Sequence, residues 1–117
     1  MRKLLATLLI LLCPALAVAA GTFLAGIEEV PLAPGLAEAP GGGMVFDSPS
    51  GRIVEAVASG QVQADQIRAF YAQTLPQLGW TRISDTEFRS ETETLRLTFD
   101  QTQKTILIVH YNLTPNH

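Results

Sequence analysis

Two histidines, His110 and His117, are the side chains of this sequence best suited to metal binding or to proton transfer near neutral pH. His110 lies in a run with the alternation of a β-strand and has no histidine or acid at ligand spacing beside it, and His117 is the last residue. A zinc or iron site needs three or four converging ligands. We therefore expect no metal and no cofactor, and we interpret the two histidines as a strand residue and a terminal residue.

The serine and carboxylate residues also show no recognisable arrangement of a catalytic site. The sequence contains no Gly-x-Ser-x-Gly elbow, and Ser48 stands beside a turn proline. A pairing of Ser48 with His110 stays open, because sequence alone does not show which residues meet. Glu91 and Glu93 lie in a predicted turn, where acids are usually solvated, and Gly41–Gly43 lacks the helix and lysine of a phosphate loop. We therefore predict that the protein is not an enzyme.

Three of the aromatic residues, Phe70, Tyr71 and Trp80, allow two interpretations. They could form an aromatic ligand box, or they could pack in the core of the domain. Their spacing is helical, and Gly79 precedes Trp80 at a predicted corner, which favours core packing. An apolar pocket between helix and sheet that binds a small ligand remains the alternative function.

A helix is the most regular element that the sequence predicts. It begins near Ala64, and its apolar stripe consists of Ile67, Phe70, Tyr71, Thr74, Leu75 and Leu78. Pro76 should bend or end the helix, because proline lacks the backbone donor. Gly79 stands where a helix-ending glycine adopts the left-handed conformation.

Alternating apolar and polar residues predict β-strands on both sides of this helix. The expected strands are Met44–Asp47, Arg52–Ser59, Trp80–Ile83, Glu87–Arg89, Thr94–Asp100 and Thr105–Leu113. Their order with the helix is β-β-α-β-β-β-β. The sequence thus predicts a single α+β domain over residues 44–114, in which one helix packs across one face of an antiparallel sheet of about five to six strands.

Residues 21–43 are rich in glycine, alanine and proline, and they show neither a helical nor a strand period. Pro31 and Pro34 forbid a continuous helix, so we expect an extended N-terminal arm. Its apolar residues form the candidate partner-binding set, which is Phe23, Ile27, Val30, Leu32 and Leu36. One alternative, which we favour, is that the arm covers Ile106 and Ile108 of its own sheet. The other is that a partner protein takes the arm as an added strand.

Residues 1–20 have the three parts of a secretory signal peptide, and cleavage after Ala19 or Ala20 satisfies the small-x-small rule. An uncleaved membrane anchor is a rival interpretation, but the apolar run is at the low edge of the roughly 20 residues that span a bilayer. A lipoprotein acylated at Cys13 is another, but Leu12 stands where that processing needs a small residue. We expect a periplasmic or secreted mature chain without a membrane span.

The charge balance of the mature chain disfavours anionic partners. Of the eight basic residues, Arg2 and Lys3 leave with the signal, so six remain against eleven acidic residues and the net charge is near −5. Nucleic acids and anionic membrane surfaces bind proteins of the opposite sign. We therefore expect no nucleic acid among the partners.

Three strings of the mature chain are EEVPLAPGL (Glu28–Leu36), VFDSPSGRIVEA (Val45–Ala56) and FYAQTLPQLGW (Phe70–Trp80). Together they resemble a family of small exported bacterial proteins of uncharacterised function, whose FYxxxLPxLGW motif marks a helix-to-strand corner. The resemblance implies export to the periplasm and carries no known activity to any residue. With catalytic motifs missing, we predict a protein-interaction module of the bacterial envelope, which would use the arm or a sheet edge to contact a protein partner.

Overall fold

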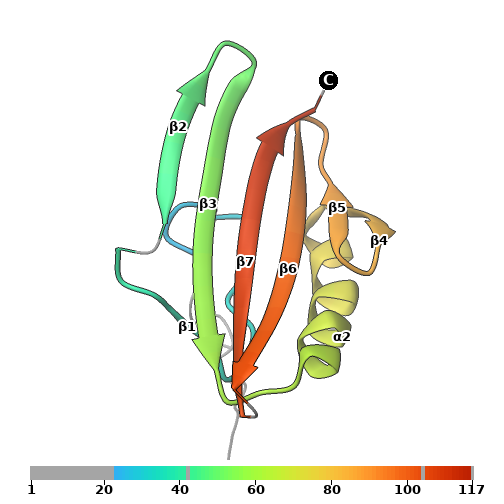
Figure 1. The fold of residues 1–117 in the computed structure, drawn as a ribbon. Helices are drawn as coiled ribbons and strands as arrows, with labels where there is room; N and C mark the ends of the chain where they lie inside the picture. The colour runs from blue at the N-terminus through green and yellow to red at the C-terminus, as the bar shows by residue number, and fades with distance from the viewer. Residues whose placement is uncertain (1–22, 42, 104, 117) are drawn as a thin grey trace, which may run out of the picture.

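The computed structural model describes residues 23–41, 43–103 and 105–116, and within them the chain forms a seven-stranded antiparallel sheet with one α-helix (Figure 1). The elements are β1 (Ala37–Glu38), β2 (Met44–Ser48), β3 (Gly51–Gly60), α2 (Ala64–Thr74), the 3₁₀ helix η1 (Leu75–Leu78), β4 (Thr81–Ser84), β5 (Glu87–Arg89), β6 (Glu93–Gln103) and β7 (Ile106–Pro115). The predicted signal peptide, residues 1–20, and His117 lie outside the described residues.

The strand order across the sheet is β1-β3-β7-β6-β5-β4, and β2 pairs with β3. The long strands β3, β7 and β6 form the centre of the sheet (Figure 1). The predicted α+β class, an antiparallel sheet with one helix, is confirmed for the described residues. The expected number of five to six strands is wrong, because two residues of the arm, Ala37 and Glu38, pair with Ser59 and Ala58 and add β1.

The helix ends where the sequence places a proline and a glycine. α2 buries Ile67 and Tyr71, which lie four residues apart on one face. The chain then tightens into η1, whose first residues include Pro76. Gly79 has φ +102°, a left-handed conformation that suits glycine, and the amide of Trp80 donates to a carbonyl at the start of η1 at 3.1 Å. This corner turns the chain into β4 and places the Trp80 side chain in the core.

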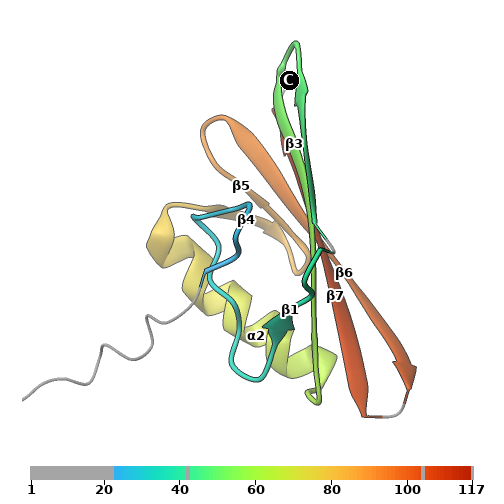
Figure 2. The same ribbon diagram turned by 90° about the vertical axis from the view of Figure 1, so that its left-hand side faces the viewer.

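One face of the sheet carries the core. Alternate residues of the two central strands β3 and β7 are buried on it, namely Val54, Ala56, Ala58, Leu107, Val109, Tyr111 and Leu113. Figure 2 shows α2 and the arm together on one side of the sheet, while no described segment covers the other side. The period of two in these strands therefore separates a covered face from a face that is open to solvent.

The arm packs on the helix side of the sheet, so the expectation that it covers Ile106 and Ile108 is wrong. Those two residues lie on the opposite face and are half-buried. The 11 residues of α2 span about 16 Å, whereas the 10 residues of β3 span about 33 Å, so the helix alone leaves part of the apolar face uncovered. Leu24, Ile27 and Val30 of the arm belong to the core cluster and cover the remainder.

A pair of tyrosines joins the arm, the helix and the sheet. Tyr71 Oη on α2 donates to Pro31 O at 2.7 Å and lies 2.7 Å from Tyr111 Oη on β7, so Tyr111 is the donor within the pair. The amide of Ala33 donates to Tyr71 Oη at 3.2 Å. Burial raises the pKa of Tyr71 to about 12, and it also raises the pKa of Tyr111.

These raised pKa values predict a loss of stability in alkaline solution. A tyrosine in the unfolded chain titrates near pH 10, whereas folded Tyr71 keeps its proton to about pH 12. The free energy of unfolding should therefore fall as the pH rises from about 10 to about 12, and Tyr71 alone should contribute up to about 3 kcal/mol to this loss. Urea denaturation across this range measures the slope. The Tyr71→Phe/Tyr111→Phe variant is the control that should flatten it, and a flat profile for the parent protein would contradict the buried pair.

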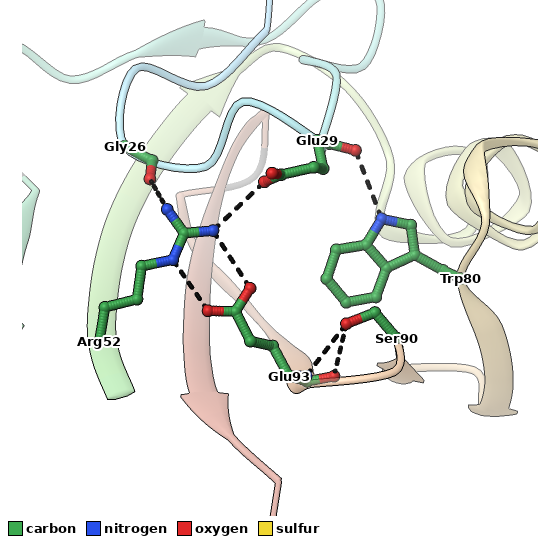
Figure 3. A network of polar contacts seen from close by, with 6 residues as sticks. All are labelled: Gly26, Glu29, Arg52, Trp80, Ser90 and Glu93. Atoms are coloured by element: carbon green, nitrogen blue, oxygen red, sulfur yellow. Dashed lines mark hydrogen bonds and ion pairs between the residues drawn. The ribbon is translucent and has the colours of Figure 1, made fainter. Parts of the chain in front are cut away.

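Arg52, at the start of β3, holds the arm at another point (Figure 3). Its Nε and Nη2 donate to the two carboxylate oxygens of Glu93 at 2.8 and 3.1 Å, and these bonds are the main reason that the pKa of the guanidinium is raised. Nη2 also reaches Glu29 at 3.3 Å, and Nη1 reaches Gly26 O at 3.5 Å. Trp80 Nε1 donates to Glu29 O at 3.3 Å. Glu93 is thus an anchor of the fold, and the expectation of a solvated turn acid is wrong for it.

Candidate interaction surface

The first strand of the β2–β3 hairpin exposes three consecutive apolar side chains. Met44, Val45 and Phe46 each leave about half of their surface or more in contact with solvent. Val45 pairs with Val54 and so lies on the covered face, while Met44 and Phe46 lie on the open face. The hairpin extends beyond the part of the sheet that α2 and the arm cover (Figure 2), so both faces of β2 stay exposed.

β2 is an edge strand with little protection against another strand. Among the described residues it pairs only with β3, so its outer row of backbone N–H and C=O groups is free. It has five residues in continuous register, without proline or lysine, and its one charged residue is Asp47. Natural sheets block their edges with short strands, charges and bulges. The edge strand β4 is shorter, contains Arg82 and has a register irregularity between Arg82 and Ser84, so it has these devices, whereas β2 lacks most of them.

A half-open hollow of about 490 Å³ lies beside β2, at the edge of β3 between the segments that β1 and β2 pair with. Val54 and Ala56 of β3 line it, as do Val45 and the small residues Ala25 and Gly26 of the arm. β1 and β2 pair with different parts of β3, and the hollow lies where this pairing is interrupted. The edge therefore combines a free backbone row with a cavity that could receive a side chain.

The charged residues of β1, of β2 and of the hollow are acidic within the described residues. Glu38 and Glu55 line the hollow, and Asp47 lies near the end of β2. Glu38 accepts a hydrogen bond from the amide of Ala25 at 2.9 Å. Arg52 pairs with Asp47 in the hairpin register, but its guanidinium binds two other carboxylates. The surface around β2 is thus apolar at its centre and acidic at its rim.

The arm residues predicted to bind a partner are mostly inside the domain. Ile27 and Val30 are fully buried, Leu36 is nearly so, and Leu32 packs against the core. Phe23 alone among the five keeps substantial exposed surface, at 41 %. In this structure the apolar side chains of the arm are mostly buried in the core of the same domain. The exposed apolar side chains that a partner could contact lie instead on β2.

The residues considered for chemistry do not come together. Ser48 pairs with Gly51 and His110 pairs with Val57, so the two lie six residues apart along β3, or about 20 Å. That separation removes the Ser48–His110 pair. No group of three or more His, Cys, Asp or Glu side chains in the described part of the chain could hold a metal ion. The helices described here are all too short or too polar to cross a membrane.

The sequence predicted the strand Met44–Asp47 but not its place at an exposed edge. A signal was present, because Met44, Val45 and Phe46 are apolar in succession and therefore occupy both faces of the strand. A strand with two apolar faces can be buried on both faces or exposed at an edge of the sheet, and periodicity does not separate these cases. Gly43 approaches Glu55 O so closely that a Cβ at this position would lie 2.9 Å from it. Glycine at this position therefore lets β2 meet β3.

Comparisons of the chain with protein-family models, with curated proteins and with solved structures gave no match. The resemblance to small exported bacterial proteins therefore stays a prediction from the three quoted strings. The function has to be inferred from the surface of the domain.

Proposed function

We propose that this protein is a non-catalytic interaction module that binds an extended segment of another protein as an added strand on the β2 edge. The observation that carries the proposal is the exposed run Met44-Val45-Phe46 on an edge strand without a bulge. Backbone hydrogen bonds to the free edge would supply affinity, and contacts above and below the sheet would supply selectivity. Binding would also remove this apolar surface from water.

The proposed setting is the bacterial envelope. Residues 1–20 have the pattern of an export signal, and the three strings resemble small exported proteins. The partner would accordingly be an envelope protein that meets the mature chain in the periplasm or outside the cell.

Binding of a small apolar ligand between helix and sheet is the other function that the sequence allows. Tyr71 and Leu75 on the helix side and Tyr111 on the sheet are fully buried. Leu24 and Ile27 of the arm belong to the same cluster, so the chain itself supplies the apolar groups that such a ligand would replace. The packing therefore supports the interaction module better than the ligand binder.

Site-specific photocrosslinking in intact producing cells tests the proposed function. A photoreactive p-benzoylphenylalanine replaces Phe46, and the same residue is placed at Leu78 or Ile83 as matched controls. The three side chains have nearly equal exposed fractions, 48 %, 46 % and 47 %, so exposure alone would label them equally. We expect covalent adducts from position 46 that map to one contiguous segment of one partner, and none from the controls.

A blocking variant completes the test. Val45→Lys places a charge on the edge strand, where it should prevent strand addition and abolish the adducts at position 46. Because Val45 is exposed, the change should alter the free energy of unfolding by only about 0.5 kcal/mol. Equal labelling at positions 46 and 78, or adducts that survive Val45→Lys, would contradict strand addition at β2.

A further inference from the structure

We infer that the segment bound at β2 carries an aliphatic side chain that enters the hollow beside Val45 and a lysine or arginine that reaches the acidic rim. This inference rests on the proposed strand addition and adds the chemistry of the partner. It follows from the lining of the hollow and from the charges that surround it.

The hollow selects for an apolar side chain. In an added strand, alternate side chains point to opposite faces of the sheet, so every second one would lie on the face of Val45 and Val54. The space exists because Ala25, Gly26 and Ala56 fill little of it. An aliphatic group would bury its surface against the exposed apolar lining of the hollow, Val45 and Ala25. A polar group in the same place would lose its hydrogen bonds to water.

The rim selects for a basic residue. Neither the Glu55 nor the Asp47 side chain forms a hydrogen bond or ion pair with another described residue. Asp47 lies on the face of Val45, and Glu55 lies on the opposite face beside Met44 in the hairpin register. A lysine or arginine on either face of the incoming strand therefore meets a carboxylate that is otherwise solvated.

A second copy of this chain fits the surface less well. Antiparallel pairing of β2 with β2 would bring the acidic rims of two copies side by side, and opposed like charges destabilise a strand pair. The chain as a whole also has a net charge of −3. The occupant that the charges favour is a different protein with basic residues in its binding segment.

Fluorescence anisotropy with the purified full chain and three labelled synthetic peptides tests the inference. The first peptide alternates isoleucine with threonine and carries two lysines, the second replaces both lysines with glutamate, and the third is the lysine peptide with prolines in its centre. We expect the lysine peptide to bind, the glutamate peptide to bind at least about tenfold more weakly, and the proline peptide not to bind.

Variants of the protein assign the binding to the hollow and to the rim. Ala25→Leu fills the hollow from an exposed position, so it should weaken the binding of the lysine peptide about tenfold. Asp47→Asn/Glu55→Gln removes the charges of the two rim carboxylates that lie on opposite faces of the hairpin. This double variant should weaken the binding of the lysine peptide about three- to tenfold and reduce the salt dependence of that binding. The control Glu91→Gln/Asp100→Asn also removes two charges, and it should change neither the affinity for the lysine peptide nor its salt dependence.

The outcomes separate the inference from the proposed function. If the lysine peptide binds no better than the glutamate peptide, or if Ala25→Leu binds like the parent, the inferred chemistry is overturned. Crosslinks at position 46 would then still support strand addition. If neither peptide binding nor crosslinking at position 46 occurs, both proposals fail. Self-association of the chain that Val45→Lys abolishes would assign the edge to a second copy and would also overturn the inference.

Discussion

Replacing Ile27 with alanine is expected to destabilise the domain by about 2–5 kcal/mol, although the residue lies in a segment rich in glycine and proline. The reason is that Ile27 is fully buried in the cluster between α2 and the sheet, so its loss leaves a cavity. A small domain has a total stability of about 5–15 kcal/mol, so this change removes a large part of it. Urea denaturation followed by tryptophan fluorescence measures the loss.

Phe23→Ala is the matched control in the same arm. Phe23 is larger than Ile27 but remains 41 % exposed, so its removal should cost less than about 1 kcal/mol. If Ile27→Ala unfolds at the same urea concentration as the parent, the arm does not belong to the core. The candidate partner-binding residues of the arm would then be available to contact a partner protein, as the sequence predicted.

Replacing Trp80 with alanine is expected to cost about 3–5 kcal/mol, the other large loss that the structure implies. The change removes a buried ring and also the donor of the 3.3 Å bond from Trp80 Nε1 to Glu29 O, which helps to hold the arm. Trp80→Phe restores part of the ring volume but not the hydrogen-bond donor. The free energy of unfolding of this variant should therefore lie between those of the parent and of the alanine variant. Thermal and urea denaturation by circular dichroism measure all three proteins.

Phe70→Ala separates the contributions of the two aromatic residues. Both were predicted from the sequence to be core residues, but Phe70 is half-buried and packs edge-on against Tyr71 with 5.1 Å between ring centroids. Its removal should cost about 1–2 kcal/mol. Equal losses for Phe70→Ala and Trp80→Ala would show that the burial assigned to Trp80 is mistaken.

Periodicity was sufficient to predict the helix and the central strands. The spacing of Ile67, Tyr71 and Leu75 matches one face of a helix, and these three residues are buried. The alternation of β7 likewise separates its buried residues, such as Leu107, from half-buried ones, such as Ile108. In both elements one face is buried and the other faces solvent, so the period of apolar residues identifies the face that packs on the core.

Neither the path of the arm nor the exposure of β2 could be predicted in this way. Pro31 and Pro34 set an extended backbone for the arm, but the face on which the arm lies depends on how much of the sheet α2 leaves uncovered. The anchor of that path is Arg52, whose partners Glu29 and Glu93 are 23 and 41 residues distant along the chain. Contacts of this range leave no local pattern in the sequence.

Hydrogen–deuterium exchange on the complex tests strand addition at β2 most directly. The purified chain is compared alone and with the partner segment that crosslinks to position 46. We expect the amides of β2 that do not bond to β3 to exchange at least about tenfold more slowly in the complex, while those of β4 at the opposite edge stay unchanged. Protection that appears on α2 or on the open face of β6 and β7, with β2 unchanged, would contradict the proposed function.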